Sequence, residues 1–198
     1  SVPIQPGIPI DTWWDIGFDD DTAIFFTQDV GREVHVVDFY ANSGEGFGHY
    51  AKMLKDKKYF YGVHTAPHDA SVHEYMTGTS RVDTARKDFG IAFEIGPMLS
   101  INAGIEMVRQ LLDICWFDEQ KCNEGIIHLE NYRKQWDERL GRWKDQPFKD
   151  SHIHAADAFR TIGVCHHFSG MKPPPRSREA MRANREKTKR LARAHRVI

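Results

Sequence analysis

Three consecutive runs of β-branched and aromatic residues near the start of the chain constrain its fold more than any other feature. They cover 12–18, 22–28 and 33–41, and only the short polar segments 19–21 and 29–32 separate them. Connections of this length join neighbouring antiparallel strands. The sequence therefore predicts a β-meander.

The rest of the chain alternates between helical and extended patterns. Apolar residues recur every three or four positions in several segments, which is typical of helices that cover a sheet. The expected helices span 48–57, 82–89, 101–115, 123–134 and 151–167, and the expected strands span 59–65 and 91–95, with a hairpin over 135–143 that turns at Gly141. This order predicts an α/β protein with a mixed sheet and helices on both faces.

Charge and proline content divide the 198 residues into three parts. Residues 1–10 hold three prolines and are expected to be an extended linker, or simply a free arm. Residues 11–170 are expected to form one domain. The triple proline 173–175 marks a boundary, and residues 171–198 carry ten Lys or Arg and two Glu, a net charge of +8, against −9 for the remainder. A basic, disordered tail is expected there.

Targeting signals and cysteine frameworks are not evident in the sequence. No apolar run approaches the ~18 residues that cross a membrane, and the first residues lack the pattern of a secretory signal. Three cysteines, without a C-x-x-C pair, favour a reducing compartment over a disulfide scaffold. A chain that is not secreted is expected.

Phosphate-binding loops are also missing, because the sequence contains neither a Walker A motif nor G-x-G-x-x-G. The glycine-rich segment 44–48 includes Glu45, which would face a bound phosphate. A plain loop accounts for this segment better than an anion site.

Two aspartates fall at positions that favour function. Asp15 lies inside the first predicted strand, where burying a carboxylate is costly unless it is paired or binds a cation. Asp69 directly follows the predicted strand 59–65, and functional groups commonly lie at the carboxyl ends of strands in α/β sheets. A helix N-cap is the alternative for Asp69.

A third group lies on the predicted helix 151–167 and just before it. Asp150, His154 and Asp157 are spaced i, i+4 and i+7, which places them along one helical face. An acidic stripe on a solvated face is the alternative interpretation. Combined with Asp15 and Asp69, these carboxylates supply the oxygen ligands that two Mg²⁺ or Mn²⁺ ions prefer. Zinc is less favoured, since the histidines lack zinc-finger spacing.

Several segments together resemble the C-terminal nuclease domain of the large terminase subunit of tailed bacteriophages, which has an RNase H-like fold. The matching segments are Trp13-Trp14-Asp15-Ile16-Gly17, Asp21-Thr22-Ala23-Ile24, Pro67-His68-Asp69-Ala70, Thr77-Gly78-Thr79-Ser80-Arg81, Gly90-Ile91, Leu129-Glu130-Asn131-Tyr132 and Asp150-x3-His154-x2-Asp157-Ala158-Phe159-Arg160. Their order and spacing are more specific than any single segment.

This resemblance implies a metal-dependent endonuclease that cleaves concatemeric double-stranded viral DNA during genome packaging by two-metal-ion hydrolysis. By the same resemblance, Asp15 bridges both ions while Asp69 and Asp157 each ligate one. Asp150 and His154 correspond to auxiliary positions near the metals, with His154 as an outer or alternative ligand.

The resemblance also implies partners and a location. The partners are double-stranded DNA, the portal protein, the small terminase subunit and the ATPase domain of the full-length protein, which this chain lacks. The location is the host cell cytoplasm, transiently at the procapsid portal. The basic tail is expected to contact portal or DNA. Residues expected to touch DNA phosphates, with solvated surface charge as the alternative, are Lys134, Arg139, Arg142 and Lys144.

Two other functions remain open on the sequence. The first keeps the RNase H-like fold but assigns junction resolution or strand transfer. The second is a non-enzymatic docking module for portal or DNA whose working part is the basic tail.

Overall fold

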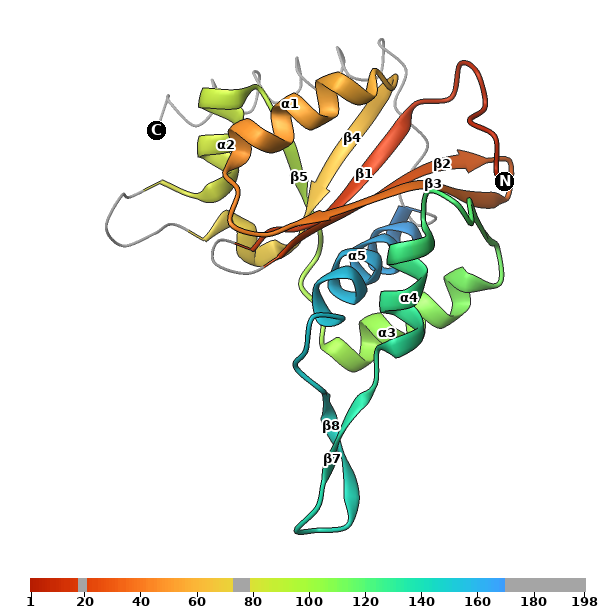
Figure 1. Ribbon diagram of the computed structural model, residues 1–198, viewed down its shortest axis with the longest axis vertical. Coiled ribbons are helices and arrows are strands. Elements are labelled where there is room, and N and C mark those ends of the chain that lie inside the picture. Colours follow the sequence, from red (N-terminus) through yellow and green to blue (C-terminus); the bar gives the residue numbers. More distant parts are fainter. Residues whose placement is uncertain (18–20, 73–78, 170–198) are drawn as a thin grey trace, which may run out of the picture. The chain divides into compact units, whose positions relative to one another are not determined.

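A six-stranded mixed sheet forms the centre of the chain in the computed structural model, which describes residues 1–17, 21–72 and 79–169 (Figure 1). The strand order is β5-β4-β1-β2-β3-β6. The strands are β1 (Ile10–Asp15), β2 (Thr22–Val30), β3 (Glu33–Asn42), β4 (Tyr61–Ala66), β5 (Phe93–Ile95) and β6 (Cys115–Phe117). The mixed sheet expected from the sequence is confirmed.

The expected meander forms the middle of this sheet. β2 pairs antiparallel with both β1 and β3, and its first seven residues are all buried. β4 runs parallel to β1, with Trp13 opposite Thr65, and β5 runs parallel to β4. Because β1 and β4 are parallel, their carboxyl ends meet at one edge of the sheet, next to Asp15 and Asp69.

Helices cover both faces of the sheet (Figure 1). One face carries α1 (Phe47–Lys57) and α2 (Arg81–Phe89), and the other carries α3 (Ile101–Leu112), α4 (Asn123–Asn131) and α5 (Ile153–Ser169). A short 3₁₀ helix, η1 (His68–Ser71), follows β4. None of the helices within the described ranges is long and apolar enough to cross a membrane.

The alternation of side chains along β1 divides the core into two layers. Trp14 is fully buried. Its indole packs edge-on against the rings of Tyr50 of α1 and Phe93 of β5. On the opposite face, Phe25 of β2 meets Phe159 of α5 at a centroid distance of 5.1 Å. Full burial of such rings contributes about 1.5–3 kcal/mol each, so both helix layers are firmly held against the sheet.

Two expected helices are shorter in the structure. The helix expected over 101–115 ends at Leu112, and Cys115 begins β6, which pairs parallel with β3 through Val34. The helix expected over 123–134 ends at Asn131. The edge strand β6 has only three residues, which is too short to produce a periodic signal in the sequence. Where apolar residues continue past the end of a helix, the sequence pattern does not show where that helix ends.

The expected hairpin is present with a longer second strand. β7 (Lys134–Asp137) pairs antiparallel with β8 (Arg142–Pro147), and Gly141 has a φ of +58° at the turn. A positive φ favours glycine because it has no Cβ.

The proline-containing start of the chain is tied to the domain. The backbone N–H of Val2 donates to Asp118 at 2.9 Å, and Gln28 donates from Nε2 to the carbonyl of Ile8 at 2.6 Å. β1 itself begins at Ile10, which is 1% exposed. The expected tail, 171–198, lies outside the described residues, as do Phe18, Thr77 and Gly78.

Candidate metal-dependent active site

Asp15 and His154 meet at the carboxyl end of β1. Asp15 is the last residue of that strand, and His154 lies in the first turn of α5. His154 Nδ1 is 3.0 Å from Asp15 Oδ2, and both side chains are about one-fifth exposed. The structure therefore joins two residues that are 139 positions apart and that the sequence analysis placed in one site.

Asp157 lies one turn further along α5 and is electrostatically linked to both residues. Burial raises the pKa of the Asp157 carboxyl, Arg160 and His154 lower it, and the charge of Asp15 raises it, with a resulting pKa of about 6. Two neighbouring carboxylates repel each other, and low solvation strengthens this repulsion. The pair is thus suited to a cation that neutralises both charges.

Arg160 is the cation that contacts Asp157 in this structure. Its Nη1 donates to Asp157 Oδ1 at 2.6 Å. A Cβ on Gly104 of α3 would lie 2.5 Å from Cδ of Arg160, so the absence of a side chain at Gly104 makes room for the arginine. Arg160 is held between two helices, with its guanidinium directed at the candidate site.

Tyr132 lies near the same carboxylate, at the end of α4. Burial raises the pKa of its hydroxyl, with a further contribution from the charge of Asp157. The hydroxyl oxygen is buried and makes no hydrogen bond of ordinary geometry within the described part of the chain. Tyr132 and Arg160 occur in the segments that resemble terminases, but sequence reasoning assigned neither of them a role. The i, i+3 spacing of Asp157 and Arg160 was the available signal.

Asp69 lies where the carboxyl end of β4 passes into η1. The N-cap of this short helix is Pro67, so Asp69 is not its N-cap. Asp69 is exposed, and the parallel pairing of β1 and β4 brings its segment to the same sheet edge as Asp15. Within the described ranges, Asp69 makes no hydrogen bond or ion pair with Asp15 or Asp157.

Asp150 precedes α5, which begins at Ile153 rather than at the expected residue 151. Its Oδ1 accepts a hydrogen bond from the backbone N–H of His152 at 3.0 Å, and its Oδ2 lies 3.0 Å from Nη1 of Arg133. The contacts of Asp150 are therefore with the entry to α5 and the base of the hairpin. Among the described residues, they do not include Asp15 or Asp157.

The donor set suits a hard divalent cation in its chemistry. Asp15 and Asp157 provide carboxylate oxygens, which Mg²⁺ and Mn²⁺ prefer, and the raised pKa of Asp157 reflects mainly its burial, with a smaller contribution from the charge of Asp15. Within the described ranges, no three His, Cys, Asp or Glu side chains converge as a ready-made site for one ion. Asp15 and Asp157 therefore fit a divalent cation in their chemistry, but the described residues do not form a complete set of ligands for it.

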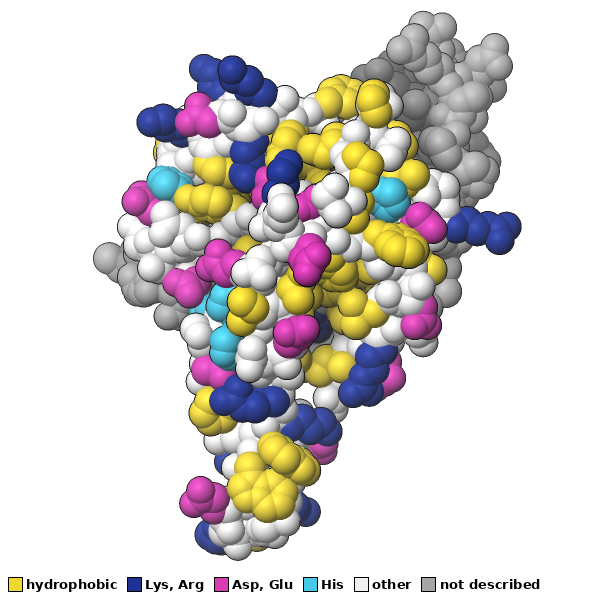
Figure 2. All heavy atoms as spheres, turned by 45° about the vertical axis from the view of Figure 1, so that its right-hand side comes forward, with side chains coloured by type: hydrophobic (Ala, Val, Ile, Leu, Met, Phe, Trp, Pro, Cys, Tyr) yellow, Lys and Arg dark blue, Asp and Glu magenta, His cyan; other side chains and the backbone are white. Residues whose placement is uncertain are grey.

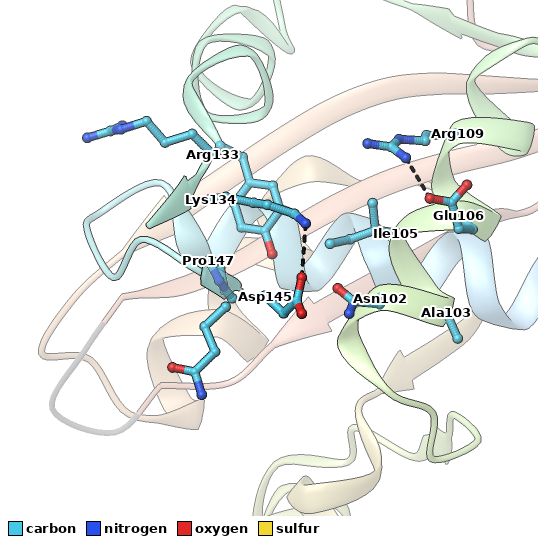
Figure 3. A pocket seen from close by; sticks show the side chains of 11 residues that line it. Asn102, Ala103, Ile105, Glu106, Arg109, Arg133, Lys134, Asp145 and Pro147 are labelled. Atoms are coloured by element: carbon cyan, nitrogen blue, oxygen red, sulfur yellow. Dashed lines mark hydrogen bonds and ion pairs between the residues drawn. The ribbon is translucent and has the colours of Figure 1, made fainter. Parts of the chain in front are cut away.

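The hairpin carries the four residues expected to contact DNA, and it borders a pocket of about 430 Å³ with the start of α3 (Figure 3). Lys134 lines this pocket and pairs with Asp145 at 3.3 Å, and Lys144 lies 3.9 Å from Asp137. Figure 2 shows hydrophobic side chains gathered near the tip of the hairpin. The exposed apolar residues there are Trp136, Leu140 and Trp143.

Arg139 and Arg142 differ from the two lysines in their contacts. No ion pair is found for either arginine among the residues that the structure describes. The charges of Arg139 and Arg142 are therefore less neutralised by neighbouring carboxylates than those of Lys134 and Lys144.

The arrangement of sheet and helices is that of an RNase H-like α/β fold. The chain shares its fold with several phage terminases. It matches the large terminase of a thermophilic bacteriophage with a TM-score of 0.62 and 18% identity, over 83% of this chain and 41% of that one. It matches the large terminase (g2p) nuclease domain of bacteriophage SPP1, solved with bound Mn, with a TM-score of 0.59 and 18% identity, over 80% and 86% of the two chains.

A third structure, the large terminase nuclease domain of P22, has a TM-score of 0.62 and 15% identity, over 84% of this chain and 85% of that one. The chain thus spans less than half of the large terminase of the thermophilic phage but most of the isolated nuclease domains. No model of a known protein family and no curated protein matches the sequence.

Proposed function

We propose that this chain is a metal-dependent endonuclease domain that cleaves double-stranded DNA during phage genome packaging. One observation carries the proposal: Asp15, His154 and Asp157 come together on a fold shared with terminase nuclease domains, one of them solved with bound Mn. The specific activity, the portal and small-subunit partners, the ATPase domain and the location at the procapsid follow from that likeness and are part of the proposal.

Each candidate residue has a distinct role in this proposal. Asp15 would help to hold both ions, Asp157 would hold one and Asp69, from the end of β4, the other. Two Mg²⁺ or Mn²⁺ ions would lower the pKa of the attacking water and stabilise the attacking and leaving oxygens. His154 fixes the orientation of the Asp15 carboxylate through the 3.0 Å contact.

Arg160 balances part of the charge of Asp157 through their 2.6 Å contact. A divalent cation held by Asp157 would take over this role, and the Arg160 guanidinium would then be suited to contact a phosphate of the cleaved strand. The proposal also includes the domain organisation: residues 11–170 form the nuclease domain, and residues 171–198 form a separate tail.

Plasmid nicking in the presence of Mn²⁺ tests the proposal. We expect the wild-type chain to nick supercoiled DNA, and Asp15→Asn and Asp157→Asn to lose at least about 100-fold in rate, because each change removes a charged ligand. Glu119→Gln, an exposed acidic residue after β6, is the matched control and should retain activity. Equal nicking by wild type and Asp15→Asn would overturn the assignment.

Two further measurements distinguish the other functions. Cleavage of a four-way junction in strong preference to linear duplex would favour a resolvase. Deletion of residues 171–198 should leave nuclease activity intact if the domain is the enzyme. A docking module would instead lose its partner binding on deletion and show no cleavage with or without those residues.

A further inference from the structure

Two histidines outside the candidate active site face each other across two segments of the chain. His128 lies on α4, and His152 lies just before α5. Their Nδ1 atoms are 3.0 Å apart, and their ring centroids are 5.0 Å apart at an interplanar angle of 61°. Both nitrogens therefore border the same small region.

The surroundings hold both residues in this orientation. Glu124, one turn earlier on α4, places Oε1 3.9 Å from Nε2 of His128, the ring nitrogen that does not face His152. The backbone of His152 is fixed by its hydrogen bond to Asp150. A carboxylate next to the outer nitrogen of a histidine favours a proton there and leaves the inner nitrogen as a lone pair.

The spacing of the two nitrogens suits one metal ion. With metal–nitrogen bonds of about 2.0–2.1 Å, two nitrogens on one ion lie about 2.9–3.4 Å apart for ligand angles between octahedral and tetrahedral. The side chain of His128 is 17% exposed, so water can complete the coordination.

We propose that His128 and His152 form a two-histidine site for a late transition-metal ion such as Ni²⁺, Co²⁺ or Zn²⁺. Imidazole nitrogens select these ions over Mg²⁺, which prefers oxygen. Among the described residues, no third His, Cys, Asp or Glu joins the pair in a metal-binding cluster, so water supplies the remaining ligands. This site is separate from the carboxylates and does not rest on the proposed nuclease function.

An ion at this position links α4 to the segment that leads into α5. The first turn of that helix carries His154 and the next carries Asp157. Occupancy therefore stabilises the entry to α5 and raises the melting temperature of the domain. A neutral N–H···N hydrogen bond accounts for the same distance without a metal, and the experiment separates these two interpretations.

Calorimetric titration of the full chain with Ni²⁺ tests the proposal, in an Asp15→Asn background that weakens metal binding at the carboxylates. We expect one site whose affinity falls at least about tenfold in His128→Gln and in His152→Gln. His49→Gln is the matched control, since His49 also has a glutamate one turn earlier, Glu45 at 3.7 Å, while its Nε2 faces the hydroxyl of Tyr40. The affinity should be unchanged in this control.

Two further measurements check that the variants are folded and test the two histidines directly as ligands. Circular dichroism confirms that each variant is folded, and two independent variants guard against the failure of one. Co²⁺ added to the full chain should give paramagnetically shifted Nε2–H signals of two histidines, which are lost in His128→Gln. Ni²⁺ binding that is equal in wild type, His128→Gln and His152→Gln, or that falls equally in His49→Gln, would overturn the site.

Discussion

Arg160 Nη1 lies 2.6 Å from Asp157 Oδ1, and both side chains are about one-quarter exposed. The charge of Arg160 lowers the pKa of Asp157, which is about 6 in the wild type. Arg160→Gln removes this charge, so the pKa of Asp157 should rise above that value. We expect a loss of about 1–3 kcal/mol in the free energy of unfolding at pH 8 without divalent metal, and a smaller loss at pH 5, where Asp157 is protonated.

Urea denaturation in EDTA at both pH values measures this difference. Arg109→Gln is the matched control, because Arg109 also pairs with a carboxylate at i−3, Glu106, but at two-thirds exposure. Exposed pairs contribute little, so a change below about 0.5 kcal/mol is expected there. Similar losses for both variants would show that Arg160 has no special role.

Asp69 and Asp150 should differ in their effect on cleavage. Asp69 follows the strand next to Asp15, whereas the Asp150 carboxylate contacts Arg133 and the backbone of His152. We expect Asp69→Asn to reduce plasmid nicking by at least about 100-fold, and Asp150→Asn to reduce it far less while lowering stability by about 1 kcal/mol. Nicking rates and urea midpoints check both. A larger activity loss in Asp150→Asn would restore its expected place near the metals.

Sequence reasoning predicted those parts of the molecule that produce local signals. The meander, the turn at Gly141 and the positions of Asp15 and Asp157 follow from alternation, turn residues and helical spacing. β6 was missed because Cys115–Phe117 gains its strand character from pairing with β3. The contact of Asp150 with Arg133 was missed for a similar reason, since Arg133 reaches Asp150 only because the hairpin returns the chain to α5.

His64 should make stability depend on pH. The indole N–H of Trp14 donates to Thr12 Oγ1 at 2.7 Å, and Thr12 Oγ1 is joined to His64 Nδ1 by a hydrogen bond of 2.6 Å. Burial lowers the pKa of His64, and its stabilising contribution is therefore complete above 6.5 and lost as pH falls through the folded pKa.

Urea titrations between pH 7.5 and about 5 measure this effect. In His64→Gln, we expect the decline in unfolding free energy over that range to be shallower than in the wild type. His68→Gln, at an exposed histidine, should keep the wild-type slope. A slope in His64→Gln that matches the wild type would contradict this account.

Arg139 and Arg142 should set the salt dependence of DNA binding. Each phosphate contact contributes about 0.9 to the slope of log K against log salt, so the double change to alanine should lower that slope by about 1.8 if both arginines contact phosphates. The control is Arg86→Ala with Lys87→Ala, which removes the same charge from exposed positions of α2 on the other face of the sheet. Fluorescence anisotropy with duplex DNA between about 50 and about 200 mM salt gives both slopes. Equal slopes would assign the hairpin charges to solvated surface.

Gly163 permits the close approach of α5 to α3. A Cβ there would lie 2.9 Å from the backbone nitrogen of Val108 and 2.9 Å from its Cγ2. Backbone cannot rotate away as a side chain does, so Gly163→Ala should lower the free energy of unfolding by about 1–3 kcal/mol despite the better helix propensity of alanine.

Gly48 provides the matched control for this substitution. It also lies in a helix, but its added Cβ would meet only the ring of Phe89, at 3.2 Å, and that side chain is 41% exposed and can adjust. Gly48→Ala should therefore leave stability unchanged or raise it by up to about 1 kcal/mol. Since α5 carries both His154 and Asp157, Gly163→Ala should also reduce nicking at temperatures where the protein is still folded. An unchanged nicking rate with reduced stability would show that the helix shifts without moving the site.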